Sequence, residues 1–393
     1  MDIRNQSKKL TEKERFLNVM HYKNVDRITH REFGYWDELK EDWYNKGYLP
    51  KDFMQNNGHI PDEKVEMFFG CEQRIDVGVN VWLTNVTKSP EVIEEKGGKR
   101  KIRDPLGIIF EEIKDGTRTI PHFLDFPIKD RKTWKVFRDE FLRIDDPVRK
   151  ISQVELDKLA AITKNTGKLT GTNFGSFVGW IRDMMGFENI AMLSFEDPEL
   201  FEEMVAHLTE IKMKCFPQIL NSGIKLDYAE GWEDICFNSG PLLNPKVFKE
   251  RVAPHIKRVM DLFRKQGIDV IWTDCDGKID DLIPYFMEAG INCMFPFEVN
   301  ASNDPVEYRK RFGKELLIMG GFNKMKLLES KDAVLAEFKR LDPLLSQGGF
   351  IPHIDHRCPA GVSFEMYQYY IKEKCYFLGM PKEEIEKIEG LRK

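Results

Sequence analysis

The sequence contains no long hydrophobic run. No stretch approaches the roughly 18 consecutive apolar residues of a membrane-spanning helix. The opening residues, MDIRNQSKKLTEKERF, contain no apolar core of signal-peptide length. A membrane protein and a secreted protein are therefore disfavoured, and we expect a cytoplasmic protein with no membrane partner.

Paired cysteines are also missing. The seven cysteines are odd in number and scattered, and none belongs to a C-x-x-C motif. Disulfide frameworks and zinc ribbons need paired cysteines at regular spacing, so neither is indicated. We expect reduced thiols, most of which fill the core.

Charge of one sign is not in excess. The 60 basic and 65 acidic residues give a formal net charge of −5 and are mixed along the chain, so no basic surface is expected to attract nucleic acid. Nucleotide binding has no support, because there is no P-loop and no G-x-G-x-x-G motif follows a predicted strand. What the sequence does have is 393 residues, 41% of them hydrophobic, enough for one large barrel or two ordinary domains.

The second half of the chain alternates between short apolar segments and amphipathic ones, which is typical of βα units around a parallel sheet. An Asp or Asn followed by proline, which marks a helix start, occurs at 197–198, 244–245 and 304–305. The second of these helices is predicted to run to Gly267. Between the helices we predict six strands, at 168–173, 224–230, 268–274, 291–298, 316–322 and 349–355.

The first part of the chain is less regular. Residues 28–36 are a candidate first barrel strand, and 63–70 a helix that leads into a second strand at 74–82. Residues 92–113 alternate around two glycine-containing turns, which predicts antiparallel hairpins. We therefore expect an α/β protein whose residues 1–393 form a single (β/α)8 TIM-barrel domain, with a hairpin insertion at about 84–125. The residues after Gly379 are predicted to form a charged terminal helix.

Polar residues gather where the predicted strands end. In parallel barrels the catalytic groups lie at the carboxyl ends of the strands, so we expect seven of these residues to surround one cavity: Asn173, Glu230, Asp274, Asp276, Glu298, His353 and His356. Asn323 and Lys324 follow another strand. The alternative for any single acid at such a place is that it caps the next helix.

Two of these acids, Asp274 and Asp276, are two residues apart on a strand and should point the same way. Two carboxylates on one face repel, and a bound cation would resolve the conflict. The alternative is that one caps a helix near Lys278 while the other binds an arginine, Arg357 or Arg182.

His353 and His356 lie at the end of the last predicted strand, close enough to serve the same site. Neutral imidazole with carboxylate is ordinary ligation for zinc or iron. Asp355 would then orient one of the rings. Zinc is the first candidate metal, and its candidate ligands are Asp274, Asp276, Glu298, His353 and His356.

Aromatic residues are frequent near the same strand ends. Trp36, Trp180, Trp232 and Tyr285 could line an apolar ligand cavity, although most of the 28 phenylalanines must pack in the core. With the amides Asn173 and Asn323, the three tryptophans are our candidates for substrate binding.

Taken in order, these motifs resemble the uroporphyrinogen decarboxylase superfamily, which also holds corrinoid-linked methyltransferases. The similarity begins at TEKERFLNVMHYKNVDRI (11–28) and continues through TGTNFGSFVGW (170–180), TDCDGKIDD (273–281) and GGFIPHIDHRCPAG (348–361). It covers nearly the whole chain. The fold that it implies is the (β/α)8 barrel that the pattern also predicts.

Two branches of the superfamily fit less well. Its decarboxylases carry an arginine-rich stretch after the first strand that holds the carboxylates of a tetrapyrrole, whereas FGYWDELKEDWY (33–44) stands at the corresponding place here. Its thiol methyltransferases carry a His-x-Cys pair where this chain has Asp274-Cys275-Asp276, and a cysteine near the last strand where it has Pro352 and His353. A site of oxygen and nitrogen donors is therefore favoured over a thiolate site.

The branch that the chain resembles most is the substrate-demethylating methyltransferases. The resemblance implies that a methyl group is transferred from a small methylated substrate, an aryl methyl ether, to the cobalt of a cobalamin (corrinoid) that a partner protein carries. Asp276, His356 and Glu230 are the candidate catalytic residues. The alternative is a decarboxylase like uroporphyrinogen decarboxylase, a pure binding role ranks last, and a homodimer is left open.

Overall fold

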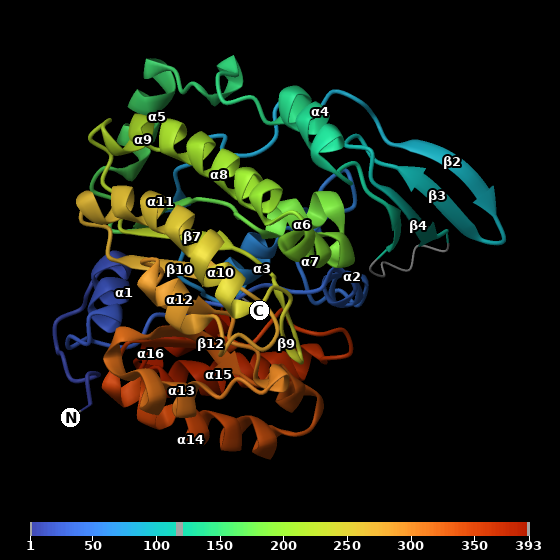
Figure 1. Cartoon of the computed structure of the whole chain (residues 1–393). Helices are drawn as coiled ribbons and strands as arrows, with labels where there is room; N and C mark the ends of the chain where they lie inside the picture. Colours follow the sequence, from blue (N-terminus) through green and yellow to red (C-terminus); the bar gives the residue numbers. More distant parts are fainter. Residues whose placement is uncertain (1, 115–120, 391–393) are drawn as a thin grey trace.

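The computed structural model describes residues 2–114 and 121–390. At its centre seven parallel strands form one sheet in the order β1-β6-β7-β10-β11-β12-β13, surrounded by helices (Figure 1). The strands are β1 (Arg74–Asp76), β6 (Leu169–Asn173), β7 (Tyr228–Trp232), β10 (Val270–Asp274), β11 (Cys293–Phe295), β12 (Leu317–Phe322) and β13 (Phe350–Ile354). Each overlaps a predicted strand, and the fold is a TIM barrel as expected.

The place of the eighth strand is taken by the segment 28–36, which forms no regular strand. Tyr35 makes an isolated parallel bridge with Cys358, just beyond β13. On the other side the backbone N–H of Glu72, just before β1, donates to the carbonyl of His30 at 2.9 Å. The segment therefore links the two edges of the seven-stranded sheet, and the prediction of a first strand holds for its position but not for its regularity.

The three helix starts predicted at 197–198, 244–245 and 304–305 are confirmed. The helices are α1 (Glu12–Met20), α2 (Asp37–Asn45), α3 (Asp62–Phe68), α4 (Arg131–Phe141), α5 (Gln153–Thr163), α6 (Gly179–Met185), α7 (Phe187–Glu196), α8 (Pro198–Cys215), α9 (Pro217–Leu220), α10 (Pro245–Arg251), α11 (Ala253–Lys265), α12 (Ile283–Glu288), α13 (Pro305–Phe312), α14 (Lys331–Gln347), α15 (Phe364–Phe377) and α16 (Lys382–Gly390). The side chain of Asp197 caps α8 by accepting from the backbone N–H of Leu200 at 3.0 Å. No helix among the described residues is both long and apolar enough to cross a membrane.

The helix predicted from Asn244 to Gly267 is wrong in one respect, because it is interrupted at Val252. Two helices, α10 and α11, replace it, and Pro254 lies in the first turn of the second. Proline has no N–H to donate and its ring collides with the preceding turn, so a helix that meets one ends and restarts.

The predicted insertion forms a separate antiparallel sheet that projects beside α4 (Figure 1). Its strands are β2 (Glu91–Lys96), β3 (Lys99–Arg103), β4 (Ile109–Ile113) and β5 (His122–Asp125), paired in that order. Residues 115–120, which belong to the predicted insertion, lie outside the described residues. A short hairpin of β8 (Cys236–Phe237) and β9 (Gly240–Pro241) follows β7.

Strand register brings the predicted site residues to one end of the barrel. Asn173 pairs with Glu230, and Trp232 pairs with Asp274. Inside the barrel the rings of Tyr228 and Trp272 stack with centroids 4.4 Å apart. That stack needs a glycine beside it, because a Cβ at Gly171 would lie 2.1 Å from the Tyr228 ring.

Candidate active site

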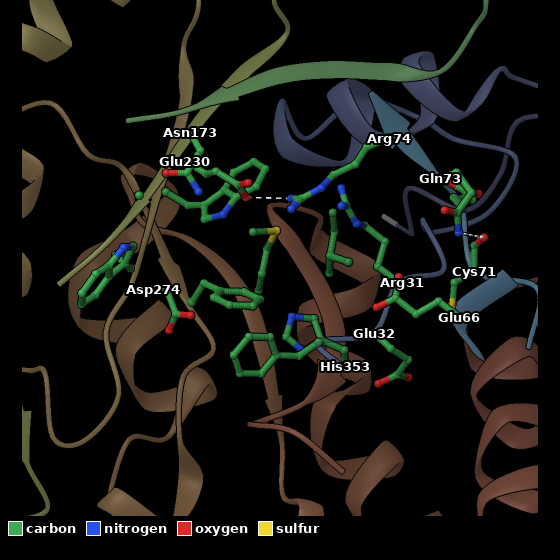
Figure 2. A pocket seen from close by; sticks show the side chains of 18 residues that line it. Arg31, Glu32, Glu66, Cys71, Gln73, Arg74, Asn173, Glu230, Asp274 and His353 are labelled. Carbon is green, nitrogen blue, oxygen red and sulfur yellow. Dashed lines mark hydrogen bonds and ion pairs between the residues drawn. The ribbon is translucent and has the colours of Figure 1, made fainter. Parts of the chain in front are cut away.

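A cavity of about 310 Å³ lies inside the barrel (Figure 2). Five of the residues singled out in the sequence line it: Asn173, Glu230, Trp232, Asp274 and His353. They come from four different strands or the residues at their ends, β6, β7, β10 and β13. The remaining wall includes the aromatic rings of Phe33, Trp272 and Phe295. Charged and amide side chains share the lining with these aromatic rings, so the cavity offers polar contacts as well as an apolar surface to a small molecule.

One wall of the cavity carries an ion pair between β1 and β7, the two strands on either side of β6. The Arg74 guanidinium donates to Glu230 Oε2 at 2.7 Å, drawn as a dashed line in Figure 2. Beside them the Tyr228 hydroxyl donates to Asp76 Oδ1 at 2.6 Å. Burial raises the pKa of Glu230, and the charge of Arg74 opposes that rise. Glu230 is therefore held in place by Arg74, which the sequence pattern did not single out.

Two further residues of the cavity, Arg31 and Glu66, were also missed. Arg31 belongs to the irregular segment 28–36, and Glu66 to α3. Burial lowers the pKa of the Arg31 guanidinium and raises the pKa of the Glu66 carboxyl to about 7. The segment 33–44 contains no arginine, but Arg31 and Arg74, which lie outside it, both line the cavity. The sequence held one signal for Arg31 and Glu66: each is a charged side chain in a segment where apolar core residues are expected.

His353 lies in the wall as a neutral imidazole. Its Nδ1 lies 2.7 Å from the carbonyl oxygen of Ile354, which can only accept, so Nδ1 carries the proton. Burial lowers the pKa of this ring to about 3. Its buried Nε2 has no hydrogen-bond partner among the described residues, so a lone pair is left for a ligand.

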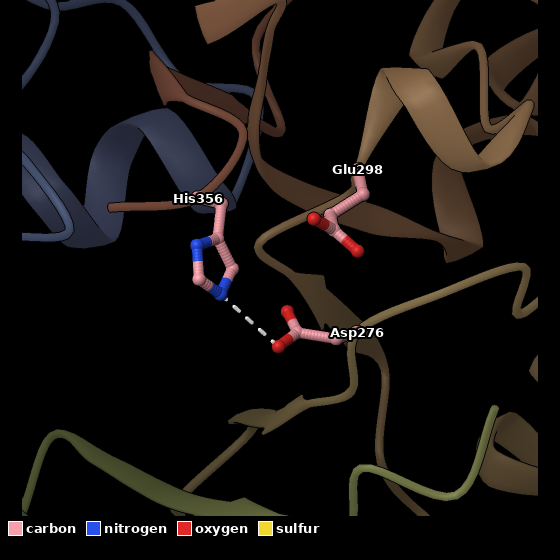
Figure 3. Close-up of side chains that lie close together, drawn as sticks. All are labelled: Asp276, Glu298 and His356. Carbon is pink, nitrogen blue, oxygen red and sulfur yellow. Dashed lines mark hydrogen bonds and ion pairs between the residues drawn. The ribbon is translucent and has the colours of Figure 1, made fainter. Parts of the chain in front are cut away.

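The other predicted acids and histidine form a cluster beside the cavity (Figure 3). One ligand atom each from Asp276, Glu298 and His356 lie within 4.8 Å of one another. His356 Nε2 is 3.2 Å from Asp276 Oδ2, and Lys324 Nζ is 3.0 Å from Glu298 Oε1. These three residues do not line the cavity.

A second group joins this cluster to the cavity wall. Asp234, Asp274 and Asp276 also bring one ligand atom each within 4.8 Å, and Asp274 lines the cavity. Burial and the neighbouring carboxylates raise the pKa of Asp274 well above its ordinary value, and burial raises that of Asp234 to about 6. Asp234 lies two residues past the end of β7 and was not among the predicted ligands.

The cluster fits a divalent cation better than the alternative of caps and arginine pairs. Arg357 pairs with Asp62 and Arg182 with Asp183, so neither binds the two aspartates. The buried Oδ1 atoms of Asp274 and Asp276 have no hydrogen-bond partner among the described residues. Carboxylate oxygens with one imidazole are donors that zinc accepts.

Asp355 does not orient a histidine ring. Its two carboxylate oxygens accept from the backbone N–H groups of Val299 at 2.8 Å and Lys324 at 2.9 Å. Of the five candidate ligands, Asp276, Glu298 and His356 lie together, and Asp274 belongs to the second group. His353 belongs to neither group and lines the cavity.

The candidate substrate-binding residues are dispersed. Trp232 and Asn173 line the cavity, whereas Trp180 is buried behind it, stacked on Trp82 with centroids 4.0 Å apart. Trp36 is 41% exposed, and its ring centroid is 5.8 Å from that of His356. Asn323 does not line the cavity, and its side chain accepts from the backbone N–H of Met325.

Comparison with known proteins places the chain in a family. A family model described as uroporphyrinogen decarboxylase (URO-D) matches residues 142–373, more than half of the chain. No curated protein sequence matches significantly.

Among solved structures, a methyltransferase from Methanosarcina mazei shares 12% identity over 98% of both chains, with a TM-score of 0.54. A B12-independent methionine synthase from a Shewanella species shares 10% identity over 62% of this chain and 68% of its own, with a TM-score of 0.38. The first similarity shows a common fold, and the second is too low to support an argument.

Proposed function

Because the chain belongs to the uroporphyrinogen decarboxylase (URO-D) family, we propose that it is a methyltransferase of that family, which demethylates a small substrate and passes the methyl group to the cobalt of a corrinoid. The donor that we propose is an aryl methyl ether. The corrinoid is carried by a partner protein that docks at the open end of the barrel.

The observation that carries this proposal is the size and lining of the cavity. Its volume of about 310 Å³ equals that of roughly ten water molecules in the liquid, at about 30 Å³ each. One aromatic ring with a few substituents fits such a space, whereas a tetrapyrrole with its carboxylate arms is several times larger. Rings of Phe33, Trp232 and Phe295 in the wall suit an aromatic guest.

The chemistry makes clear demands on the chain. An ether methyl is a poor electrophile because the oxygen leaves with negative charge, and the protein must stabilise that charge. The nucleophile is cobalt(I) of the co-substrate, so the chain needs no nucleophilic serine or cysteine. Glu230, fixed by Arg74, would orient the donor within the cavity.

Asp276 and His356, with Glu298, are the residues that would hold zinc. Zinc there would supply a Lewis acid for the developing oxygen charge. His356 Nε2 and Asp276 Oδ2 are 3.2 Å apart, so the two side chains are close enough to act on one ligand. Their position beside Asp274 puts this pair next to the cavity rather than inside it.

One observation favours a second candidate function. Arg31 and Arg74 both line the cavity, and guanidinium groups recognise carboxylates. A small carboxylated substrate would suit them, so decarboxylation remains the alternative chemistry. The cavity volume restricts that substrate to a small acid.

The two functions are separated by one assay. The protein is mixed anaerobically with cob(I)alamin and methoxybenzene or 4-methoxybenzonitrile, and methylcobalamin formation is followed by absorbance. We expect methylcobalamin and the corresponding phenol in equal amounts. Carbon dioxide release from a small aromatic acid, without any cobalt methylation, would instead establish the decarboxylase. Full activity in Asp276→Ala would remove Asp276 from the mechanism.

A further inference from the structure

Five carboxyl groups line the cavity, and their partners differ. They are Glu32, Glu66, Glu72, Glu230 and Asp274. Glu230 is paired with Arg74, and Asp274 belongs to the aspartate group beside the cavity. Both have roles in the site already described.

Two of the remaining three are neutralised by buried cations. Lys374 Nζ lies 2.6 Å from Glu32 Oε1, and both side chains are fully buried. Glu72 Oε1 accepts from Arg15 at 2.8 Å and from Arg27 at 2.6 Å. These ion pairs hold the first segment of the chain to the barrel, and each offsets the buried negative charge of its carboxylate.

Glu66 differs from the three paired glutamates, Glu32, Glu72 and Glu230. Within residues 2–114 and 121–390, its carboxyl group makes no hydrogen bond and no ion pair with another side chain, yet it lines the cavity (Figure 2). Its helix, α3, begins at Asp62 and is separate from the strands that supply the other polar residues. A largely buried carboxyl group without a partner is costly to keep unless it serves a ligand.

The groups around Glu66 raise the pKa of its carboxyl group toward neutral pH. Burial is the largest effect, and it raises the pKa to about 7. Asp62 from its own helix and Glu32 from the segment 28–36 raise it further, whereas Arg31 from that segment and Arg74 from β1 lower it. A carboxyl group that titrates near the working pH is suited to general acid catalysis.

We propose that Glu66 is a further catalytic residue, the acid that protonates the departing oxygen of the methyl donor. The assignment rests on the proposed methyl transfer. As the methyl carbon bonds to cobalt, cobalt(I) supplies the electron pair and is oxidised to cobalt(III). The electrons of the broken carbon–oxygen bond stay on oxygen, which takes the Glu66 proton and leaves as a phenol.

The neighbouring Arg31 supports the return of Glu66 to its starting state. Once Glu66 has lost its proton, the guanidinium of Arg31 stabilises the carboxylate that remains. Water reprotonates it after the phenol has left. Asp276 and His356 lie outside the cavity lining, so stabilisation at the cluster and proton donation from Glu66 are separate functions.

The test compares two ethers that differ in their need for an acid. The cyano group of 4-methoxybenzonitrile delocalises the negative charge of the departing phenoxide, so this ether has a better leaving group than methoxybenzene. With cob(I)alamin as acceptor, we expect Glu66→Gln to lower kcat for methoxybenzene about 100-fold, the usual effect of a general acid. The loss for 4-methoxybenzonitrile should be less than about tenfold.

The pH profile gives an independent readout. Because the acid acts while protonated, wild-type kcat for methoxybenzene should fall as pH rises through about 7, and the Glu66→Gln profile should be flat there. The control is Glu63→Gln, an exposed glutamate of the same helix, which should behave as wild type. Equal thermal stability of both variants would show that the fold is intact.

The failures are distinguishable. Equal losses for the two ethers, with an unchanged pH profile, would mean that the proton comes from elsewhere while methyl transfer stands. A wild-type protein that methylates no cobalt from either ether would overturn the proposed function and the Glu66 assignment together.

Discussion

At the scale of single residues, the Arg74–Glu230 pair shows how the cavity is stabilised and made polar at once. Glu230 is almost fully buried, and Arg74 is its only ion-pair partner among the described residues. Removing one member of such a pair leaves the other charge without compensation. The pair therefore offsets two buried charges and gives the cavity wall polar groups.

Arg74→Met should lower the free energy of unfolding by about 2 kcal/mol at pH 8, the cost of a lost charge-assisted hydrogen bond. Burial raises the pKa of Glu230 in the folded chain. The fold therefore loses stability as the pH rises above the pKa that this carboxyl group has in the unfolded chain. The variant should raise the pKa in the folded chain further, and the difference from wild type should shrink as pH falls toward 4, where Glu230 is protonated in both.

Urea unfolding at pH 8 and at pH 4.5 measures this difference. The double variant Arg74→Met/Glu230→Gln should recover much of the stability at pH 8, because no buried charge remains. A loss that is the same at both pH values would show that Arg74 acts through packing on Tyr228, over which its guanidinium lies at 5.8 Å.

At the scale of secondary-structure elements, β12 depends on a glycine. Gly320 has a φ of +100°, and a Cβ there would lie 1.8 Å from the carbonyl oxygen of Pro296. His353, on the neighbouring strand, packs 3.1 Å from the same position. Backbone atoms cannot give way as a flexible side chain can, so no side chain fits at this position.

Gly320→Ala should therefore destabilise the fold by more than about 3 kcal/mol, since backbone strain and a steric collision add. The matched control is Gly267→Ala, just after α11, which also has a positive φ of +83° but no atom within 4 Å of the added Cβ. It should cost about 1 kcal/mol. Denaturant midpoints of the two variants report the comparison, and equal losses would mean that the close approach to Pro296 is relieved by a backbone shift.

Elements with a local signal could be predicted from the sequence, whereas those that depend on distant partners could not. The cap at Asp197 and the proline after it predicted the start of α8, because both act within one turn. Segment 28–36 could not be predicted as irregular, because its bridge joins Tyr35 to Cys358, far away in the sequence.

The same distinction applies to the candidate site. Strand ends are visible in a sequence, and five of the residues chosen there line the cavity. Arg31 and Glu66 come from an irregular segment and a helix, so no strand-end pattern could point to them. Trp180 was chosen for its residue type alone, and its stacking on Trp82 depends on a chain crossing that the sequence does not reveal.

At the scale of the whole molecule, the acidic cluster links metal binding to stability. Asp234, Asp274 and Asp276 come from the ends of β7 and β10, and Glu298 and His356 from beyond β11 and β13. A cation bound among them would tie together four places on the barrel. Any ligand that binds only the folded chain stabilises it by mass action.

Zinc should therefore raise the melting temperature of the protein. Free zinc at 100 times its dissociation constant adds about 2.7 kcal/mol, which for a chain of 393 residues corresponds to a rise of about 3 °C, taking an unfolding entropy of about 2.1 cal/mol/K per residue. The rise should be larger at pH 8 than at pH 6, because zinc must displace protons from its ligands. Calorimetry of chelator-treated protein with and without zinc measures it, alongside elemental analysis of protein purified without chelator.

Asp276→Asn should abolish the response, since Asp276 belongs to both ligand groups, whereas Asp183→Asn, which alters a carboxylate outside them, should preserve it. Purified protein that holds no stoichiometric zinc, or an Asp276→Asn variant that responds like wild type, would show that the cluster is not a zinc site.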